Sequence, residues 1–119
     1  MFQTQNSKKY DLEDRTFDFA RDIRNCLKQI NKTTASVEDI KQLVRSSGSV
    51  AANYIEANEA LSKKDFAMRI KICRKEAKES KLWLRLLASE SVTNPTINNL
   101  IQEATELTKI FGSMVEKSK

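Results

Sequence analysis

The sequence contains no histidine, and only two cysteines, two glycines and one proline occur among its 119 residues. Without histidine, the chain lacks the commonest general base, the commonest metal ligand and every histidine-dependent catalytic triad. No pair of Asp, Glu or Lys residues stands out from the surface charge as a replacement. We therefore expect a protein that is not an enzyme, with no catalytic residues, no metal site and no cofactor.

The scarcity of glycine and proline predicts long helices with few turns. No uncharged apolar run approaches about 18 residues, and the first residues lack the apolar segment of a signal peptide. We therefore expect a cytoplasmic protein that does not enter a membrane. In that compartment Cys26 and Cys73 do not form a disulfide framework. We interpret them as small buried hydrophobic residues, with a reactive thiol as the alternative.

Apolar residues recur at alternating steps of three and four in four segments, which is the pattern of a helical bundle seam. These segments cover residues 12–30, 37–58, 66–87 and 97–114. Short polar connections between them favour antiparallel neighbours. The sequence therefore predicts an all-α, antiparallel up-down four-helix bundle that forms a single domain over residues 1–119, with residues 1–9 as a loose tail.

Residues that favour helix N-termini precede each segment. They are Asp11, Ser36 with Asp39 three residues later, Ser62, and Asn94 followed by Pro95. The expected seam of the second helix is Val37, Ile40, Val44, Ser47, Ala51, Tyr54 and Asn58.

Residues 43–60 combine small and polar side chains in the middle of the second helix. A glycine inside a helix costs about 0.5–1 kcal/mol relative to alanine. We expect its presence to reflect a tight contact with another helix, formed by Ser47, Gly48, Ala51 and Ala52. The alternative is a helix that is merely weak at this point. Asn58 is interpreted either as a polar core group that fixes the register or as part of a frayed helix end.

The positive charge of the chain is concentrated in the third helix. Residues 63–85 include nine Lys or Arg and three Asp or Glu. At about 100° per residue, most of these cations fall on one side of the helix, over a length of about 30 Å. We define the basic stripe as Lys64, Lys71, Arg74, Lys75, Lys78, Lys81 and Arg85. Such a stripe suits a phosphate backbone, and the alternative is a solvated face that keeps the protein soluble.

A second apolar side of the third helix points away from its seam. Apolar residues outside a bundle core indicate a subunit interface, and the alternative is that they cover the edge of the core. The expected oligomer interface consists of Phe17 on the first helix together with Met68, Ile72, Trp83 and Leu86 on the third.

Two stretches, RSSGSVAANYIEANEALSKKDF and KICRKEAKESKLWLRLL, carry a family resemblance. They resemble the small four-helix-bundle proteins encoded in intervening sequences of bacterial large-subunit (23S) ribosomal RNA genes. The resemblance covers about residues 10–115 and implies an antiparallel bundle, a ring-like homopentamer and no known enzymatic activity. The accessory variability proteins of diversity-generating retroelements look similar in fold, and they pair a basic pentamer with a reverse transcriptase and nucleic acid.

Many relatives read Ser-apolar-Pro-x-Asn-x-x-Glu-Gly through the second helix. Here Ala51 stands in place of the proline and Ala57 in place of the glycine, which predicts a less kinked helix. Asn53 and Glu56 match the pattern. We interpret them as structural residues that form hydrogen bonds between helices or subunits, with a ligand site as the alternative.

Two functions are consistent with these features. The first is a homo-oligomer, expected to be a pentamer, that binds RNA or another nucleic acid through the basic stripe. The second is an oligomeric adaptor or scaffold whose basic stripe docks an acidic protein partner.

Overall fold

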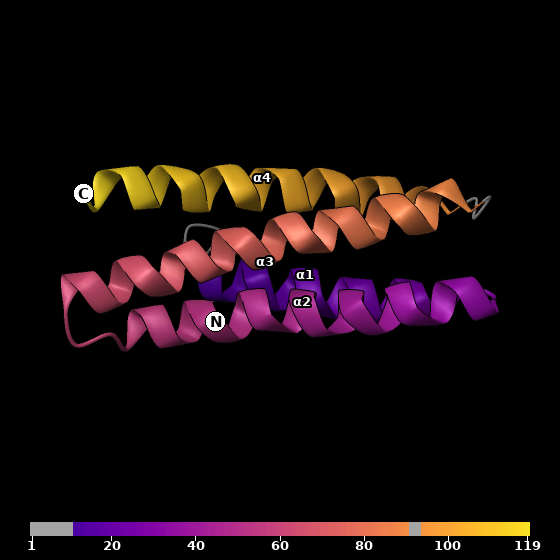
Figure 1. The fold of residues 1–119 in the computed structure, drawn as a ribbon, viewed down its shortest axis with the longest axis horizontal. Coiled ribbons are helices and arrows are strands. Elements are labelled where there is room, and N and C mark those ends of the chain that lie inside the picture. The colour runs from indigo at the N-terminus through magenta and orange to yellow at the C-terminus, as the bar shows by residue number, and fades with distance from the viewer. Residues whose placement is uncertain (1–10, 91–93) are drawn as a thin grey trace, which may run out of the picture.

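The computed structural model describes residues 11–90 and 94–119. In this part of the chain four helices follow one another: α1 (Leu12–Leu27), α2 (Thr34–Asn58), α3 (Lys63–Ser89) and α4 (Pro95–Lys117). The predicted all-α bundle is therefore confirmed (Figure 1). The expected loose tail lies outside the described residues.

Three of the predicted helix starts are confirmed by cap hydrogen bonds. The side chains of Asp11 and Ser62 accept from the backbone N–H three residues later, and Asn94 accepts from the N–H of Thr96. Pro95 occupies the first turn of α4, where its missing N–H removes no intrahelical bond.

The predicted start of α2 at Ser36 is wrong. Thr33 caps the helix, and its hydroxyl accepts from the backbone N–H of Ser36 at 3.1 Å. The Ser36 hydroxyl in turn accepts from the backbone N–H of Thr33 at 2.8 Å. This reciprocal capping box satisfies two backbone donors, so the helix begins about one turn earlier than the spacing of Ser36 and Asp39 suggests.

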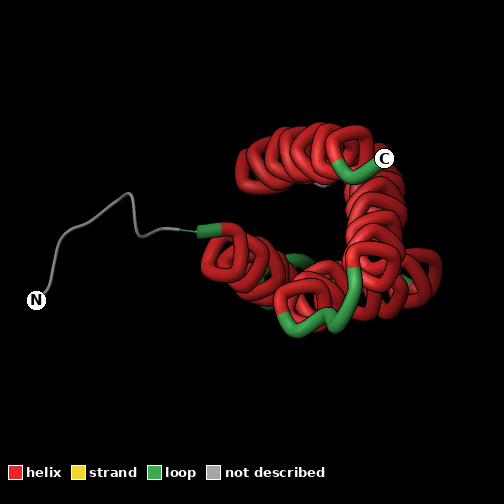
Figure 2. The backbone as a smooth tube through the Cα atoms, turned by 90° about the vertical axis from the view of Figure 1, so that its left-hand side faces the viewer, coloured by secondary structure: helices red, strands yellow, loops and turns green. Residues whose placement is uncertain are grey.

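The four helices are arranged in chain order around the bundle. α2 packs against α1 and α3, and α3 packs against α2 and α4. α1 and α4 meet along a small part of their length, and an end-on view shows them standing apart (Figure 2). α1 is also the shortest helix, because it ends at Leu27 although its seam continues to Ile30. The bundle is therefore closed less tightly between its first and last helices than elsewhere.

The core runs along the inside of the bundle and includes Phe19, Ile23, Ile70, Leu107 and Phe111, none more than 1% exposed. Burying a side chain of this kind contributes roughly 1.5–3 kcal/mol. These contacts explain why the amphipathic helices associate.

The expected seam of α2 is partly wrong. Val37 is 40% exposed and Asn58 is also exposed, whereas Leu43 and Val50, outside that seam, are completely buried. α2 is covered by α1 on one side and by α3 on the other. Its buried surface is therefore wider than a single coiled-coil seam.

Candidate nucleic-acid interface

The seven residues of the basic stripe all belong to α3. Lys64, Lys71, Lys75, Lys78 and Arg85 are exposed, and Arg74 and Lys81 are half-buried. The seam side of α3 is held in the core by residues such as Ile70, Cys73 and Leu84. A rigid, well-anchored helix therefore presents these cations.

Within the described part of the chain, no member of the basic stripe forms a salt bridge or a side-chain hydrogen bond. The arginines outside the stripe differ, because each has an intramolecular partner. They are Arg15, Arg21, Arg24, Arg45 and Arg69. Lysines elsewhere in the described chain, such as Lys41 and Lys109, also lack a partner, but the stripe gathers seven such cations, including both unpaired arginines, on one helix.

Two of the three acidic residues of α3, Glu76 and Glu79, do not neutralise the basic stripe, because they pair with a cation of α2. The Arg45 guanidinium donates to Glu76 and to Glu79, with N–O distances of 3.3 and 3.0 Å. The hydrogen bond with Glu76 raises the pKa of Arg45. These two carboxylates are thus occupied by a cation from the neighbouring helix, and the outer face of α3 keeps its positive charge.

The five expected interface residues do not share one surface. Met68 and Leu86 are 47% and 38% exposed on α3, and Ile72 is half-buried. Phe17 is 60% exposed on α1, which packs beside α2 and α4 and is not a neighbour of α3 in the bundle. Its ring is covered by the guanidinium of Arg21, whose carbon lies 5.8 Å from the ring centroid. Phe17 therefore belongs to a different face of the protein.

Trp83 packs partly against the core, and the environment of its indole N–H is unusual. Its indole Nε1 is buried, and it has no hydrogen-bond partner among the described residues. Leaving a buried donor unsatisfied costs about 1–3 kcal/mol. The apolar spacing did not reveal Leu82, which is 47% exposed on the same helix.

The small-residue contact of α2 is only partly as expected. A Cβ atom on Gly48 would lie 3.1 Å from Nη2 of Arg24, so Gly48 makes room for this α1 side chain. Ser47 is buried, and its hydroxyl accepts from Arg24. Ala51 is half-buried, but Ala52 is exposed and takes no part in a tight contact.

α2 and α3 also approach each other closely, at a point that the sequence did not predict. There the hydroxyl oxygens of the fully buried Ser46 and Ser80 lie 2.8 Å apart.

The polar residues of α2 connect it to its neighbours. Asn53 accepts from Arg69 of α3 at 3.0 Å, and Glu56 lies 4.0 Å from the same guanidinium. The interpretation of Asn53 and Glu56 as interhelical structural residues agrees with these contacts. Asn58 is exposed at the end of α2 and donates to Glu13 of α1 at 2.9 Å, so it is not a core group.

Both cysteines are free and buried. Burial raises the pKa of the Cys73 thiol to about 12 and also raises that of Cys26. Because thiolates are the reactive form, these side chains serve as small hydrophobic residues, as expected.

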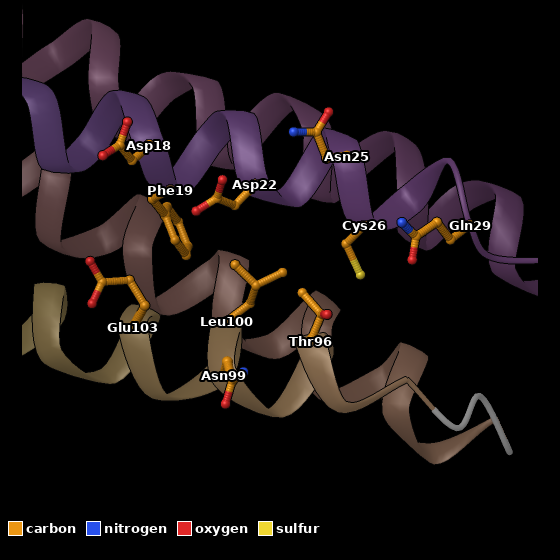
Figure 3. Close-up of a pocket in the computed structure, with 10 residues that line it drawn as sticks. All are labelled: Asp18, Phe19, Asp22, Asn25, Cys26, Gln29, Thr96, Asn99, Leu100 and Glu103. Atoms are coloured by element: carbon orange, nitrogen blue, oxygen red, sulfur yellow. The ribbon is translucent and has the colours of Figure 1, made fainter.

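The gap between α1 and α4 forms a groove of about 430 Å³. Phe19, Cys26 and Leu100 form its apolar part (Figure 3). The amide side chains that also line the groove are those of Asn25, Gln29 and Asn99. Its charged lining residues are Asp18, Asp22 and Glu103. Each of these carboxylates is paired with an arginine, Asp18 and Asp22 with Arg21 and Glu103 with Arg15. This acidic groove, whose lining itself includes no lysine or arginine, is a feature that the linear charge pattern does not reveal.

Within residues 11–90 and 94–119 no cluster of His, Cys, Asp or Glu has the composition and geometry of a metal site. In the same ranges, none of the helices combines the length and the apolar character needed to cross a membrane.

The chain is similar to known proteins in both sequence and structure. The sequence model of a family described as 23S rRNA-intervening sequence protein matches residues 8–113. A crystal structure from Bacteroides thetaiotaomicron, of a protein with unknown function from the S23 ribosomal protein family, is 30% identical. That likeness has a TM-score of 0.75 and covers 88% of this chain and 98% of the other. No curated protein matches.

Proposed function

Because the chain belongs to the family of 23S rRNA-intervening sequence proteins, we propose that it is a non-enzymatic, cytoplasmic, homo-oligomeric protein that binds RNA. The bound surface is the basic stripe of α3. The observation that carries this proposal is the absence of intramolecular partners for its seven cations within the described residues. Point charges spaced along about 30 Å suit the phosphates of a nucleic-acid backbone and require no recognition of particular bases.

The homo-oligomer, expected to be a pentamer, is supported by the second side of α3. Met68, Leu82 and Leu86 expose apolar surface there, and Trp83 holds a buried N–H without an acceptor in its own chain as far as the structure describes it. A neighbouring subunit would bury this exposed apolar surface. A ring would repeat the basic stripe, so that weak individual sites combine into measurable binding.

Charge reversal within the basic stripe tests the proposal. Lys75 and Lys78 are both exposed and unpartnered in the described chain, so the Lys75→Glu/Lys78→Glu variant should keep its fold. We expect it to lose binding to structured RNA in a gel-shift or fluorescence anisotropy titration. Lys41→Glu/Lys109→Glu is the matched control, because it changes the net charge equally on exposed positions of α2 and α4. Equal loss in both variants would mean that only net charge matters.

The adaptor function remains the second candidate, and the exposed Met68, Leu82 and Leu86 beside the basic stripe favour it. An acidic protein partner would contact both kinds of residue at once. RNA binding by the Lys75→Glu/Lys78→Glu variant with the affinity of the parent would favour this second function.

A further inference from the structure

A hollow of about 750 Å³ lies where the beginning of α3 meets the end of α4, at one end of the bundle (Figure 1, left). We call this hollow the lysine pocket, because its cationic lining residues are Lys63, Lys64, Lys71 and Lys119, and Asp65 is the acidic one. Ala67, Met68 and Val115 give it an apolar wall. A volume of this size lies within the range of small-molecule binding sites, roughly 300–1,000 Å³.

A second hollow, of about 520 Å³, adjoins the lysine pocket and shares Ser62, Lys63, Ser118 and Lys119 with it. It adds a further cation, Lys117. The two hollows together thus bring five lysines and one aspartate to the same end of the bundle.

The lysines of the lysine pocket are available to a ligand. Within the described residues, Lys63, Lys64 and Lys71 form no ion pair, whereas Lys119 pairs with Glu116 at 3.0 Å. The pocket is also continuous with the basic stripe, because Lys64 and Lys71 belong to both. A nucleic-acid strand that follows the stripe toward the beginning of α3 therefore arrives at the lysine pocket.

We infer that the lysine pocket holds a terminal phosphate of the bound nucleic acid, with the adjoining nucleotide against Met68 and Val115. This inference rests on the proposed function. A terminal phosphomonoester carries about −1.5 to −2 charges at neutral pH, whereas an internal phosphodiester carries one. Lysine binds phosphate as a point charge, so several converging lysines favour the more highly charged terminal group.

The acidic groove on the other side of α4 provides the contrast. Its lining contains three carboxylates and no lysine or arginine (Figure 3). Of the two kinds of hollow, the lysine pocket alone has the charge that a phosphate requires.

Competition binding tests this inference. An internally labelled single-stranded RNA is displaced by unlabelled RNAs of one sequence that carry a 5′-phosphate, a 3′-phosphate or hydroxyl groups at both ends. A nucleoside monophosphate is a fourth competitor. We expect one phosphate-ended RNA to bind roughly tenfold more tightly than the hydroxyl-ended RNA, since two or more lysines contact the added charge.

The pocket variant is Lys63→Ala/Lys119→Ala, whose residues line the lysine pocket but lie outside the basic stripe, and Lys41→Ala/Lys109→Ala is its matched control. We expect the pocket variant to lose the preference for a phosphorylated end while it still binds hydroxyl-ended RNA, and we expect the control to keep that preference. Equal affinities of the parent protein for all three RNAs would overturn the inference and leave the proposed function intact. A nucleoside monophosphate that competes as well as the phosphate-ended RNA would also overturn it, because the pocket would then bind a free nucleotide. Failure of every RNA to bind would instead overturn the proposed function.

Discussion

On α1, each arginine has a partner within the chain. Arg15 binds Glu103 of α4 at 2.7 Å, Arg21 binds Asp22 of its own helix, and Arg24 donates to the backbone carbonyl of Val44 in α2. On the basic stripe of α3, Arg74 and Arg85 have no such partner in the described chain. The same residue type is therefore used in two ways on helices that are not neighbours in the bundle.

This difference separates charges that are paired within the bundle from charges that we propose to bind another molecule. Two arginines of α1 join neighbouring helices: Arg24 reaches α2, and Arg15 connects α1 to Glu103 of α4 beside the acidic groove. The cations of the basic stripe repel one another and, within the described chain, form no pair that would stabilise the fold. A cluster of like charges without internal partners is better explained by an external ligand than by stability.

The largest expected effect is the response of RNA binding to salt. If about five residues of the basic stripe contact phosphates of single-stranded RNA, the logarithm of affinity falls by roughly 0.7 per contact for each tenfold increase in salt. Raising salt from about 50 to 200 mM then weakens binding about a hundredfold. Anisotropy titrations at both salt concentrations measure this change. A nearly flat response would show that the free cations of α3 do not bind the backbone.

The second-largest expected effect concerns oligomer stability and compares an aromatic residue of α3 with one of α1. Trp83→Ala should weaken the oligomer by about 2 kcal/mol, because buried aromatic anchors dominate interfaces. Phe17→Ala on α1 should have a smaller effect, since Phe17 lies on a different face from the apolar residues of α3 and contacts Arg21 of its own helix. Sedimentation equilibrium of both variants and the parent measures the difference. A parent that remains monomeric at micromolar concentration would contradict the proposed assembly.

The smallest effect tests the paired charges of α1. Arg15→Met removes the ion pair with Glu103, whose partners are 29% and 28% exposed. We expect the free energy of unfolding to fall by about 0.5–1 kcal/mol in urea titrations, with RNA affinity unchanged. Lys75→Met on the basic stripe should stay within about 0.5 kcal/mol of the parent. Equal destabilisation by the two changes would contradict the distinction between stabilising paired cations on α1 and unpaired cations on α3.

The predicted architecture and most helix boundaries followed from local patterns. Apolar spacing identified four helices, and the side chains of Asp11, Ser62 and Asn94 were recognisable caps. The start of α2 was missed because its capping box depends on a reciprocal bond between Thr33 and Ser36. The family resemblance is confirmed by the match over residues 8–113.

The basic stripe was predictable for the same reason, since residues on one helix have fixed angular positions whatever surrounds the helix. Its lack of partners was not predictable. Arg69 and Arg74 are similar in sequence context, yet Arg69 binds Asn53 of α2, whereas Arg74 lies beside Gly112 of α4 without a polar partner in the described chain.

The helices, their apolar faces and the line of positive charge on α3 follow from the sequence alone, because each depends on spacing within one segment. The packing of the helices decides which charges are paired, that Phe17 and Trp83 lie on different faces, and where the acidic groove and the lysine pocket form. These features depend on the distance and angle between helices, and residues such as Asp22 and Leu100, or Lys63 and Val115, are far apart in the chain. Such distances arise from the packing of whole helices and are not contained in the periodicity of any one of them.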